Sequence, residues 1–292
     1  MSARPAPPRP RLSRRCSVLL RHRRFRGWLW AIAAGPAISA ALQGPTPASE
    51  QPIRAATFRS GPPDSGAVAL TFDDGPHPSL TPRLIQTLKG QGATATFFLL
   101  GEQVEKFPDV ARSLAEAGFE LGNHGYSHRD LTRLEGAALH EEIGRTQALI
   151  EAATGRRPHL FRPPYGQIND TVARAAAEEG LDIVTWSVDP RDWDRNRTPE
   201  QILDQIDREG AAGAIILLHD IHARTIDLTP GIIEGLRAKA LRFAAAGELV
   251  EAEKAARRRR EAERSAEGSG PASASPATPP IVPLRDSAPP RS

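Results

Sequence analysis

Five short segments of the chain carry side chains that could bind a metal ion or move a proton, and each follows an apolar run. Apolar runs of this length, separated by amphipathic segments, are typical of strands in parallel β–α units. In such folds the carboxyl ends of the strands meet at one rim, where functional side chains gather. The five segments are TFDDGP with Asp73 and Asp74, HGYSH with His124 and His128, RPPYG with Arg162 and Tyr165, DPRDW with Asp189, Asp192 and Trp193, and LLHD with His219 and Asp220.

The two histidines of the second segment are candidate metal ligands. His124 and His128 are four residues apart, and a single helical turn would direct both imidazoles to the same face. With one carboxylate from the neighbouring strand end they would form a three-ligand site with an open position, the pattern of a catalytic rather than a structural zinc. A water bound there would lose its proton near neutral pH. An HxxxH pair taken alone is also compatible with a structural or exposed position.

The adjacent aspartates of the first segment can divide two tasks. Successive residues leaving a strand point to different sides, so one carboxylate can bind the metal while the other acts as a general base. Arg162 could hold that base ionised through a charge-assisted hydrogen bond. His219 could protonate a leaving amine, with Asp192 raising its pKa. Taken singly, each segment could instead be a turn, a surface residue or a helix cap.

The elements that must position these residues follow from the alternation of apolar and amphipathic segments. It predicts strands at 67–72, 93–100, 119–124, 159–164, 182–188 and 213–220, and helices at 80–92, 109–118, 134–155, 169–180, 198–210 and 229–247. Thr81 is expected to cap the first helix, and residues 248–250 to form a last short strand. The repeating order predicts an α/β fold, a (β/α) barrel rather than a small open sheet.

The segments outside this alternating region have distinct compositions. Residues 1–42 join an arginine-rich stretch to an apolar run shorter than the ~20 residues that span a bilayer, which predicts a signal peptide or an N-terminal membrane anchor. A disordered basic arm is the alternative. Residues 43–65 are expected to be a linker, 66–250 the catalytic domain, and 251–292 a solvated or frayed charged helix followed by a disordered tail. We therefore expect an exported protein of the periplasm or cell envelope, either cleaved or membrane-anchored.

Charge and cysteine content exclude some classes of function. The net charge is +3, but residues 1–45 contain nine arginines and no acid, so the basicity does not belong to a folded nucleic-acid-binding face. Cys16 is the only cysteine, which excludes an intramolecular disulfide and a cysteine-based zinc site. Any metal must therefore be held by histidine and carboxylate side chains.

The five segments, in this order, resemble the motifs of the polysaccharide deacetylases, the NodB-like carbohydrate esterase family 4. The resemblance covers about residues 66–250. It implies a distorted (β/α) barrel with about seven parallel strands and a divalent metal, often zinc, with cobalt or another metal as alternatives. It also implies an N-acetylated glycan as partner and the hydrolytic removal of N-acetyl groups from N-acetylglucosamine-type sugars.

The resemblance assigns a role to each motif residue. It implies that Asp74, His124 and His128 bind the metal, and that Asp73 is the catalytic base, oriented by Arg162. It implies that the backbone N–H of Tyr165 binds the oxyanion and that His219, with Asp192 as its partner, is the general acid. The substrate pocket would include Trp193, Leu217 and Pro163. Gly125 departs from the pattern, because a serine or threonine usually follows the first histidine. The missing hydroxyl predicts a looser metal loop or weaker metal binding, for which Ser127 could compensate.

Two other functions are compatible with these residues. One is a glycan-binding protein without catalysis on the same scaffold, and the other is an amidohydrolase for a non-polymeric N-acyl or formyl sugar. The motifs specify amide chemistry but not the flanking subsites, so peptidoglycan, chitooligosaccharide and exopolysaccharide all remain candidate substrates. The oligomeric state is open.

Overall fold

The computed structural model describes residues 53–268, and the predicted export segment at 1–42 lies outside them. Among the described residues, no helix combines the length and apolar character needed to cross a membrane. Eight strands are assigned within this range, namely β1 (Thr57–Phe58), β2 (Ala67–Asp73), β3 (Thr96–Leu99), β4 (Glu120–Asn123), β5 (Leu160–Phe161), β6 (Asp182–Val184), β7 (Ile215–His219) and β8 (Arg242–Phe243).

The strands form one curled parallel sheet in the order β1-β6-β5-β4-β3-β2-β7, and β8 pairs with the first residues of β2. Isolated bridges join Val188 to Ile216 and Ser60 to Ala214, so the two edges of the sheet approach each other. This arrangement confirms the predicted distorted (β/α) barrel with about seven parallel strands. The carboxyl ends of β2, β4, β5 and β7 consequently face the same rim.

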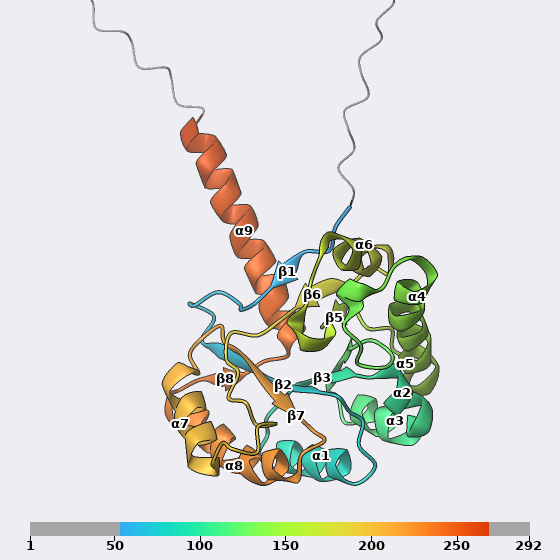
Figure 1. Ribbon diagram of the computed structural model, residues 1–292. Coiled ribbons are helices and arrows are strands. Elements are labelled where there is room, and N and C mark those ends of the chain that lie inside the picture. The colour runs from blue at the N-terminus through green and yellow to red at the C-terminus, as the bar shows by residue number, and fades with distance from the viewer. Residues whose placement is uncertain (1–52, 269–292) are drawn as a thin grey trace, which may run out of the picture. The chain divides into compact units, whose positions relative to one another are not determined.

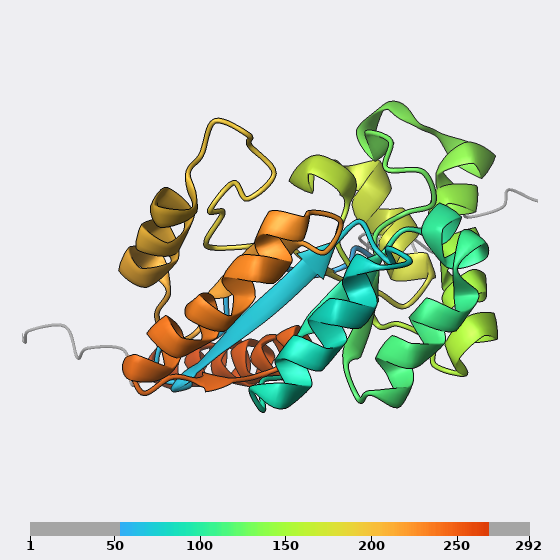
Figure 2. The same ribbon diagram turned by 90° about the horizontal axis from the view of Figure 1, so that it is seen from below.

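Helices cover the outside of the sheet (Figures 1 and 2). Neighbouring helices pack in the succession α7, α8, α1, α3 and α5, with α2 also against α5. Their bounds are α1 Leu80–Gly90, α2 Gly101–Lys106, α3 Pro108–Glu116, α4 Gly136–His140, α5 Thr146–Thr154, α6 Asp170–Glu178, α7 Pro199–Glu209, α8 Ala223–Ala238 and α9 Ala246–Gly268, with a π-helical segment Glu141–Arg145 and short 3-10 turns Leu131–Arg133 and Pro164–Gly166.

The core explains why the strand segments are apolar on both faces. Every residue of β2 is buried, because one face packs on the helices and the other lines the inside of the curled sheet. Phe72 and Phe97 stack with ring centroids 5.3 Å apart. At Gly122 a Cβ atom would lie 2.4 Å from the ring of Phe98, so β4 needs a glycine there to let the two strands pack.

The folded domain begins earlier than the predicted linker boundary at residue 65. Strand β1 pairs with β6 in register Thr57 to Ile183 and Phe58 to Val184, and Phe58 is fully buried. The Pro-, Ser- and Gly-rich composition around this strand concealed it, because two residues carry no periodic pattern. The linker prediction is therefore wrong for residues 57–58.

Helix α8 also differs from its prediction, because it begins at Ala223 rather than 229 and contains Pro230. Proline lacks the N–H of a helical hydrogen bond and usually marks a first turn, which is why the sequence suggested a start there. Buried Ile226 and Ile232 flank the proline in the same helix, so packing against the sheet outweighs the lost bond.

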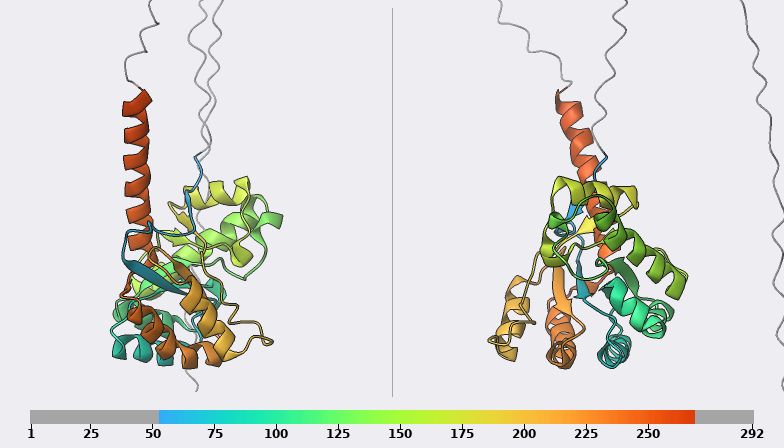
Figure 3. Two further views of the ribbon diagram at one scale, coloured as in Figure 1. Left: turned by 90° about the vertical axis from the view of Figure 1, so that its left-hand side faces the viewer. Right: turned by 45° about the vertical axis from the view of Figure 1, so that its right-hand side comes forward.

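The predicted strand at 248–250 is instead helical, because α9 begins at Ala246. The backbone N–H of Ala246 donates to the Thr96 hydroxyl (2.8 Å) and that of Gly247 to the Glu120 carboxylate (2.9 Å), at the amino ends of β3 and β4. Leu249 is buried, so the first turns of α9 belong to the domain core. The later part of α9 extends away from the sheet as an exposed helix (Figure 3).

Candidate metal and catalytic site

The sheet register brings the motif residues together at one rim. Asp73 is the last residue of β2 and pairs with His219 at the end of β7. Strand β4 ends at Asn123, directly before His124, and β5 ends directly before Arg162. Parallel pairing aligns these strand ends, so residues up to 146 positions apart become neighbours.

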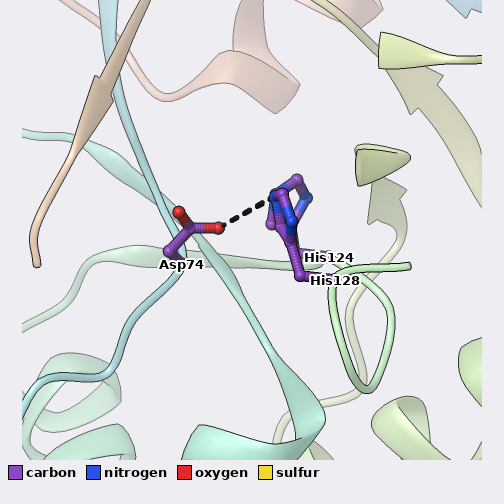
Figure 4. A group of neighbouring side chains, drawn as sticks. All are labelled: Asp74, His124 and His128. Atoms are coloured by element: carbon purple, nitrogen blue, oxygen red, sulfur yellow. Dashed lines mark ion pairs between the residues drawn. The ribbon is translucent and has the colours of Figure 1, made fainter. Parts of the chain in front are cut away.

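Asp74, His124 and His128 offer one ligand atom each, and these atoms all lie within 4.8 Å of one another. The Asp74 Oδ1 atom lies 3.4 Å from Nε2 of His124 and 3.3 Å from Nε2 of His128 (Figure 4). Asp74 Oδ1 is buried and has no hydrogen-bond partner among the described residues. A buried acceptor facing two imidazole nitrogens fits a shared divalent cation.

The surroundings of His124 also fit a ligand role. Its Nδ1 lies 2.6 Å from the backbone carbonyl oxygen of Arg162, and a bond there requires a proton on Nδ1. That tautomer leaves the Nε2 lone pair facing Asp74, which is the usual way in which a neighbouring carbonyl orients a metal-binding histidine. Burial raises the pKa of Asp74, but its close interaction with the His124 imidazole, aided by the charges of His128 and His219, lowers that pKa to about 2.

A loop, not a helical turn, brings the two histidines together. The expectation from the four-residue spacing was wrong in this respect, because residues 124–128 adopt no regular structure. Gly125 and His128 have φ angles of 77° and 56°, in the left-handed region. The resulting reversal directs both imidazoles toward Asp74, with their ring centroids 5.2 Å apart.

Asp73 lies beside the triad and is held by Arg162. The guanidinium Nη1 of Arg162 is 2.7 Å from Asp73 Oδ1, and both side chains are buried. The remaining Arg162 nitrogens donate to the carbonyl oxygens of Val184 (3.1 Å) and Thr185 (2.9 Å). A buried arginine in this geometry holds the Asp73 carboxylate in place through a charge-assisted hydrogen bond.

His219, which is partly exposed, pairs with the buried Asp192 on the same rim. The imidazole Nδ1 lies 2.7 Å from Asp192 Oδ1, while Asp192 Oδ2 accepts bonds from the His219 N–H (2.9 Å) and the Thr225 hydroxyl (2.6 Å). Burial disfavours the imidazolium, but the hydrogen bond and charge of Asp192, with smaller contributions from Asp73 and Asp74, raise the pKa of His219 to about 9. His219 is therefore protonated at neutral pH and can donate a proton.

These side chains line a pocket of about 370 Å³. Trp193 and Tyr165 are 46% and 61% exposed at its mouth, while Leu217 is almost fully buried at its wall. Pro163 was expected in the pocket, but it is buried and is not among the lining residues. The full lining consists of Asp73, Asp74, His124, His128, Tyr165, Trp186, Asp189, Trp193, Leu217, His219 and His222.

Tyr165 occupies a strained turn next to the metal ligands. Its φ is 59°, and its ring packs edge-on against His128 with centroids 4.6 Å apart. The following Gly166 has φ 65°, and a Cβ atom there would lie 2.9 Å from the ring of Trp186. The role of Trp186 was not predicted, although the glycine after Pro-Pro-Tyr was a signal that another group approaches the backbone closely.

Asp220 was another residue without a predicted role. Its buried carboxylate packs under the DDGP turn, where a Cβ atom on Gly75 would lie 2.4 Å from it. Thr81 donates its hydroxyl to Asp220 and accepts the His77 N–H (2.8 Å), so it supports this turn rather than capping α1 as expected. Burial, with the nearby charges of Asp74 and Asp73, raises the pKa of Asp220 to about 7.

Comparisons with known proteins agree with this arrangement. The polysaccharide deacetylase family model matches residues 60–184. Over 192 residues the chain is 38% identical to the peptidoglycan-N-acetylmuramic acid deacetylase PdaC of Bacillus subtilis, covering 66% of this chain and 40% of that protein. Over 188 residues it is 37% identical to a peptidoglycan-N-acetylglucosamine deacetylase of Bacillus cereus, covering 63% of this chain and 68% of the relative.

Solved structures extend the likeness to the fold. The Bc1960 peptidoglycan N-acetylglucosamine deacetylase superposes with a TM-score of 0.63 at 35% identity, over 67% of this chain and 92% of that one. The Bacillus anthracis protein BA3943, a CE4 family pseudoenzyme, gives 0.65 at 28% identity, over 68% and 70% of the two chains. The chain spans less than half the length of PdaC. On the match to the Bacillus cereus deacetylase and on the shared fold, this chain belongs to the polysaccharide deacetylase family.

Proposed function

We propose that the chain is a metal-dependent N-deacetylase that hydrolyses the acetamide of N-acetylglucosamine-type residues in an extracytoplasmic glycan. The observation that carries the proposal is the placement of three different groups around one pocket. A candidate metal triad, a carboxylate paired with a buried arginine, and a histidine paired with a buried aspartate all line it. Amide hydrolysis needs an electrophile, a base and an acid, and the pocket provides a place for each.

The triad of Asp74, His124 and His128 would hold the cation. Its one carboxylate and two imidazoles suit zinc, and cobalt or another divalent metal is compatible with the same donors. When bound, the cation supplies Lewis acidity toward the amide carbonyl and lowers the pKa of water. Asp74 is committed to this task, because its buried Oδ1 faces both imidazoles.

Asp73 acts as the base in this proposal. Its carboxylate removes the proton from the attacking water, and Arg162 holds that carboxylate in position. The backbone N–H of Tyr165 is proposed to stabilise the negative oxygen of the tetrahedral intermediate. His219 gives its proton to the amine nitrogen as the C–N bond breaks, which releases acetate and leaves a free amine on the sugar.

The relatives support the class of substrate. They include deacetylases of peptidoglycan and, in Azorhizobium caulinodans, of chitooligosaccharides, the latter 37% identical over 158 residues. The acetamide is common to peptidoglycan, chitooligosaccharide and exopolysaccharide. A substrate outside the cytoplasm is proposed because segment 1–42 has the composition of an export signal or anchor. Determining the N-terminal residue of the mature protein, and the fraction of the protein that is bound to membranes in cells, would test this.

Acetate release tests the activity directly. Zinc-loaded protein is expected to release acetate from N-acetylglucosamine oligomers or from peptidoglycan. Asp74→Ala should lose both metal and turnover, whereas Asp73→Asn should keep the metal and lose turnover. If the loaded wild-type protein releases no acetate from any N-acyl sugar, the proposal is wrong.

Two alternatives make different predictions in the same assay. The CE4 family pseudoenzyme BA3943 shows that this fold occurs without catalysis. A glycan-binding protein of that kind would bind oligomers without releasing acetate. An amidohydrolase for a non-polymeric N-acyl or formyl sugar would act on the monosaccharide derivative as well as on oligomers. Increasing turnover with oligomer length would favour the polysaccharide substrate over both.

A further inference from the structure

The metal loop, residues 124–128, rests on one buried carboxylate to which the proposed mechanism gives no task. Glu142 Oε2 accepts the backbone N–H groups of Tyr126 (2.9 Å) and Ser127 (3.0 Å), and Oε1 accepts the Ser127 hydroxyl (2.5 Å). The residue is 6% exposed. A carboxylate that accepts three bonds from a loop of five residues is a strong constraint on that loop.

Glu142 reaches the loop from an irregular part of its helix. The sequence predicted one continuous helix over 134–155, but residues Glu141–Arg145 form a π-helical segment between α4 and α5. Such segments are rare and occur often at functional sites. The carbonyl of Ile143 in the same segment accepts the Asn123 side-chain N–H (2.9 Å), and Asn123 Oδ1 in turn accepts the N–H of Gly125 (2.8 Å). The π-helical segment therefore supports both ends of the metal loop.

The backbone at Gly125 shows why this support matters in the present chain. Gly125 replaces the serine or threonine expected at this motif position, and its φ of 77° is a conformation that side chains disfavour. A Cβ atom built there would lie 3.6 Å from Glu142 Oε2, an ordinary contact distance. Space for a Cβ atom therefore exists, but the loop conformation at this position favours glycine.

We propose that Glu142 is a positioning residue of the metal site. It fixes the direction in which His128 leaves the loop, through the backbone N–H groups of Tyr126 and Ser127, and it supplies the bracing expected from a hydroxyl at position 125. The inference rests on the proposed function only in assuming that the triad binds a divalent cation. Loss of a partner that orients metal ligands typically lowers metal affinity by roughly 10- to 100-fold.

The test measures zinc affinity by competition with a chromophoric chelator, without using turnover. Glu142→Ala should bind zinc roughly 10- to 100-fold more weakly than wild type. Glu142→Gln should stay within a few-fold of wild type, because its amide oxygen can accept both N–H groups and its amide nitrogen can donate to the Ser127 hydroxyl. Ser127→Ala, which removes only the hydroxyl contact, should have an intermediate effect.

Glu105 provides a matched control. Its carboxylate accepts the Tyr126 phenol O–H (2.6 Å) and pairs with the Arg145 guanidinium (3.0 Å), but none of its hydrogen bonds is to the loop backbone. Glu105→Ala should therefore leave zinc affinity unchanged. Thermal unfolding of the metal-free variants verifies that each one folds. If Glu142→Ala does not fold, the zinc affinities of Ser127→Ala and Glu105→Ala are compared instead. Equal affinities of these two variants would overturn the inference.

Two further outcomes would overturn it. A folded Glu142→Ala variant with wild-type zinc affinity would show that the carboxylate does not position the loop. An equally large loss in Glu142→Gln would assign the effect to the negative charge rather than to the hydrogen bonds. Failure of this inference can be distinguished from failure of the proposed function. A wild-type protein that binds zinc but releases no acetate would contradict the proposed function and not the role of Glu142.

Discussion

The pair of His219 and Asp192 allows a quantitative prediction for Asp192→Asn. Asparagine keeps an oxygen that can accept the His219 N–H and the Thr225 hydroxyl, but it places an amide N–H opposite Nδ1 of the imidazole. That contact suits neutral histidine with an unprotonated Nδ1 and opposes the imidazolium. The substitution therefore changes the protonation of His219 with little change in shape.

The size of the effect follows from the pKa of His219, which is raised from 6.5 to about 9. This elevation corresponds to about 3 kcal/mol in favour of the imidazolium. If the variant returns to 6.5, the protonated fraction at pH 8 falls from about 90% to about 3%, a loss of roughly 30-fold. At pH 6 both forms are mostly protonated, and the difference is less than about twofold.

The assay is kcat/KM for acetate release as a function of pH, expressed as the ratio of variant to wild type. A cation held by Asp74 offsets part of the negative charge near His219, so the wild-type alkaline limb is expected at or below pH 9. The variant should approach wild type near pH 6 and fall progressively behind it as the pH rises. An equal loss at every pH would refute the role of Asp192 in protonation, and an unchanged rate at pH 8 would refute His219 as the acid.

The same elevation makes a prediction for folding. Because the pKa of His219 is higher in the folded protein, its contribution to stability is complete below pH 6.5 and is lost as the pH rises through about 9. Urea unfolding of the metal-free protein should show that this pair contributes up to about 3 kcal/mol less to the free energy of unfolding above pH 9 than below pH 6.5. The pKa elevation sets this upper limit. Asp192→Asn should remove most of that pH dependence.

Three further substitutions test the packing of the site and of its scaffold. Arg162→Met removes the arginine partner of the buried Asp73 carboxylate and should reduce the free energy of unfolding by about 3–5 kcal/mol, measured in urea. A loss below about 1 kcal/mol would contradict a strong contribution from the buried pair. Gly166→Ala should displace the Trp186 ring, because the new Cβ atom would lie 2.9 Å from that ring. The substitution should raise KM more than it lowers kcat, and unchanged kinetics would place Trp186 outside the substrate site. Leu249→Ala should destabilise the domain by about 2–5 kcal/mol, whereas no loss would mean that the first turns of α9 are dispensable.

Parts of the fold were predictable because their determinants are local. The apolar run of β2 and the amphipathic pattern of α7 are visible within a dozen residues, and the alternation of such segments indicates parallel β–α units. The two-residue strand β1 and the course of α8 through Pro230 were not predictable, because only contacts with distant residues stabilise them. The residue pattern of a segment reflects its own conformational preferences and not its packing partners.

The sequence by itself determined which chemical groups this protein has and in which order they occur along the chain. Five ordered motifs indicated the family, a histidine and carboxylate metal site, and separate tasks for Asp73 and Asp74. Only the tertiary structure decided which atoms meet. The register of β2 with β7 places Asp73 beside His219, and a loop held by Glu142, rather than a helical turn, turns His128 toward Asp74. The physical reason is that chemical type belongs to each residue alone, whereas distance and direction arise from hydrogen bonds and packing between residues far apart in the chain.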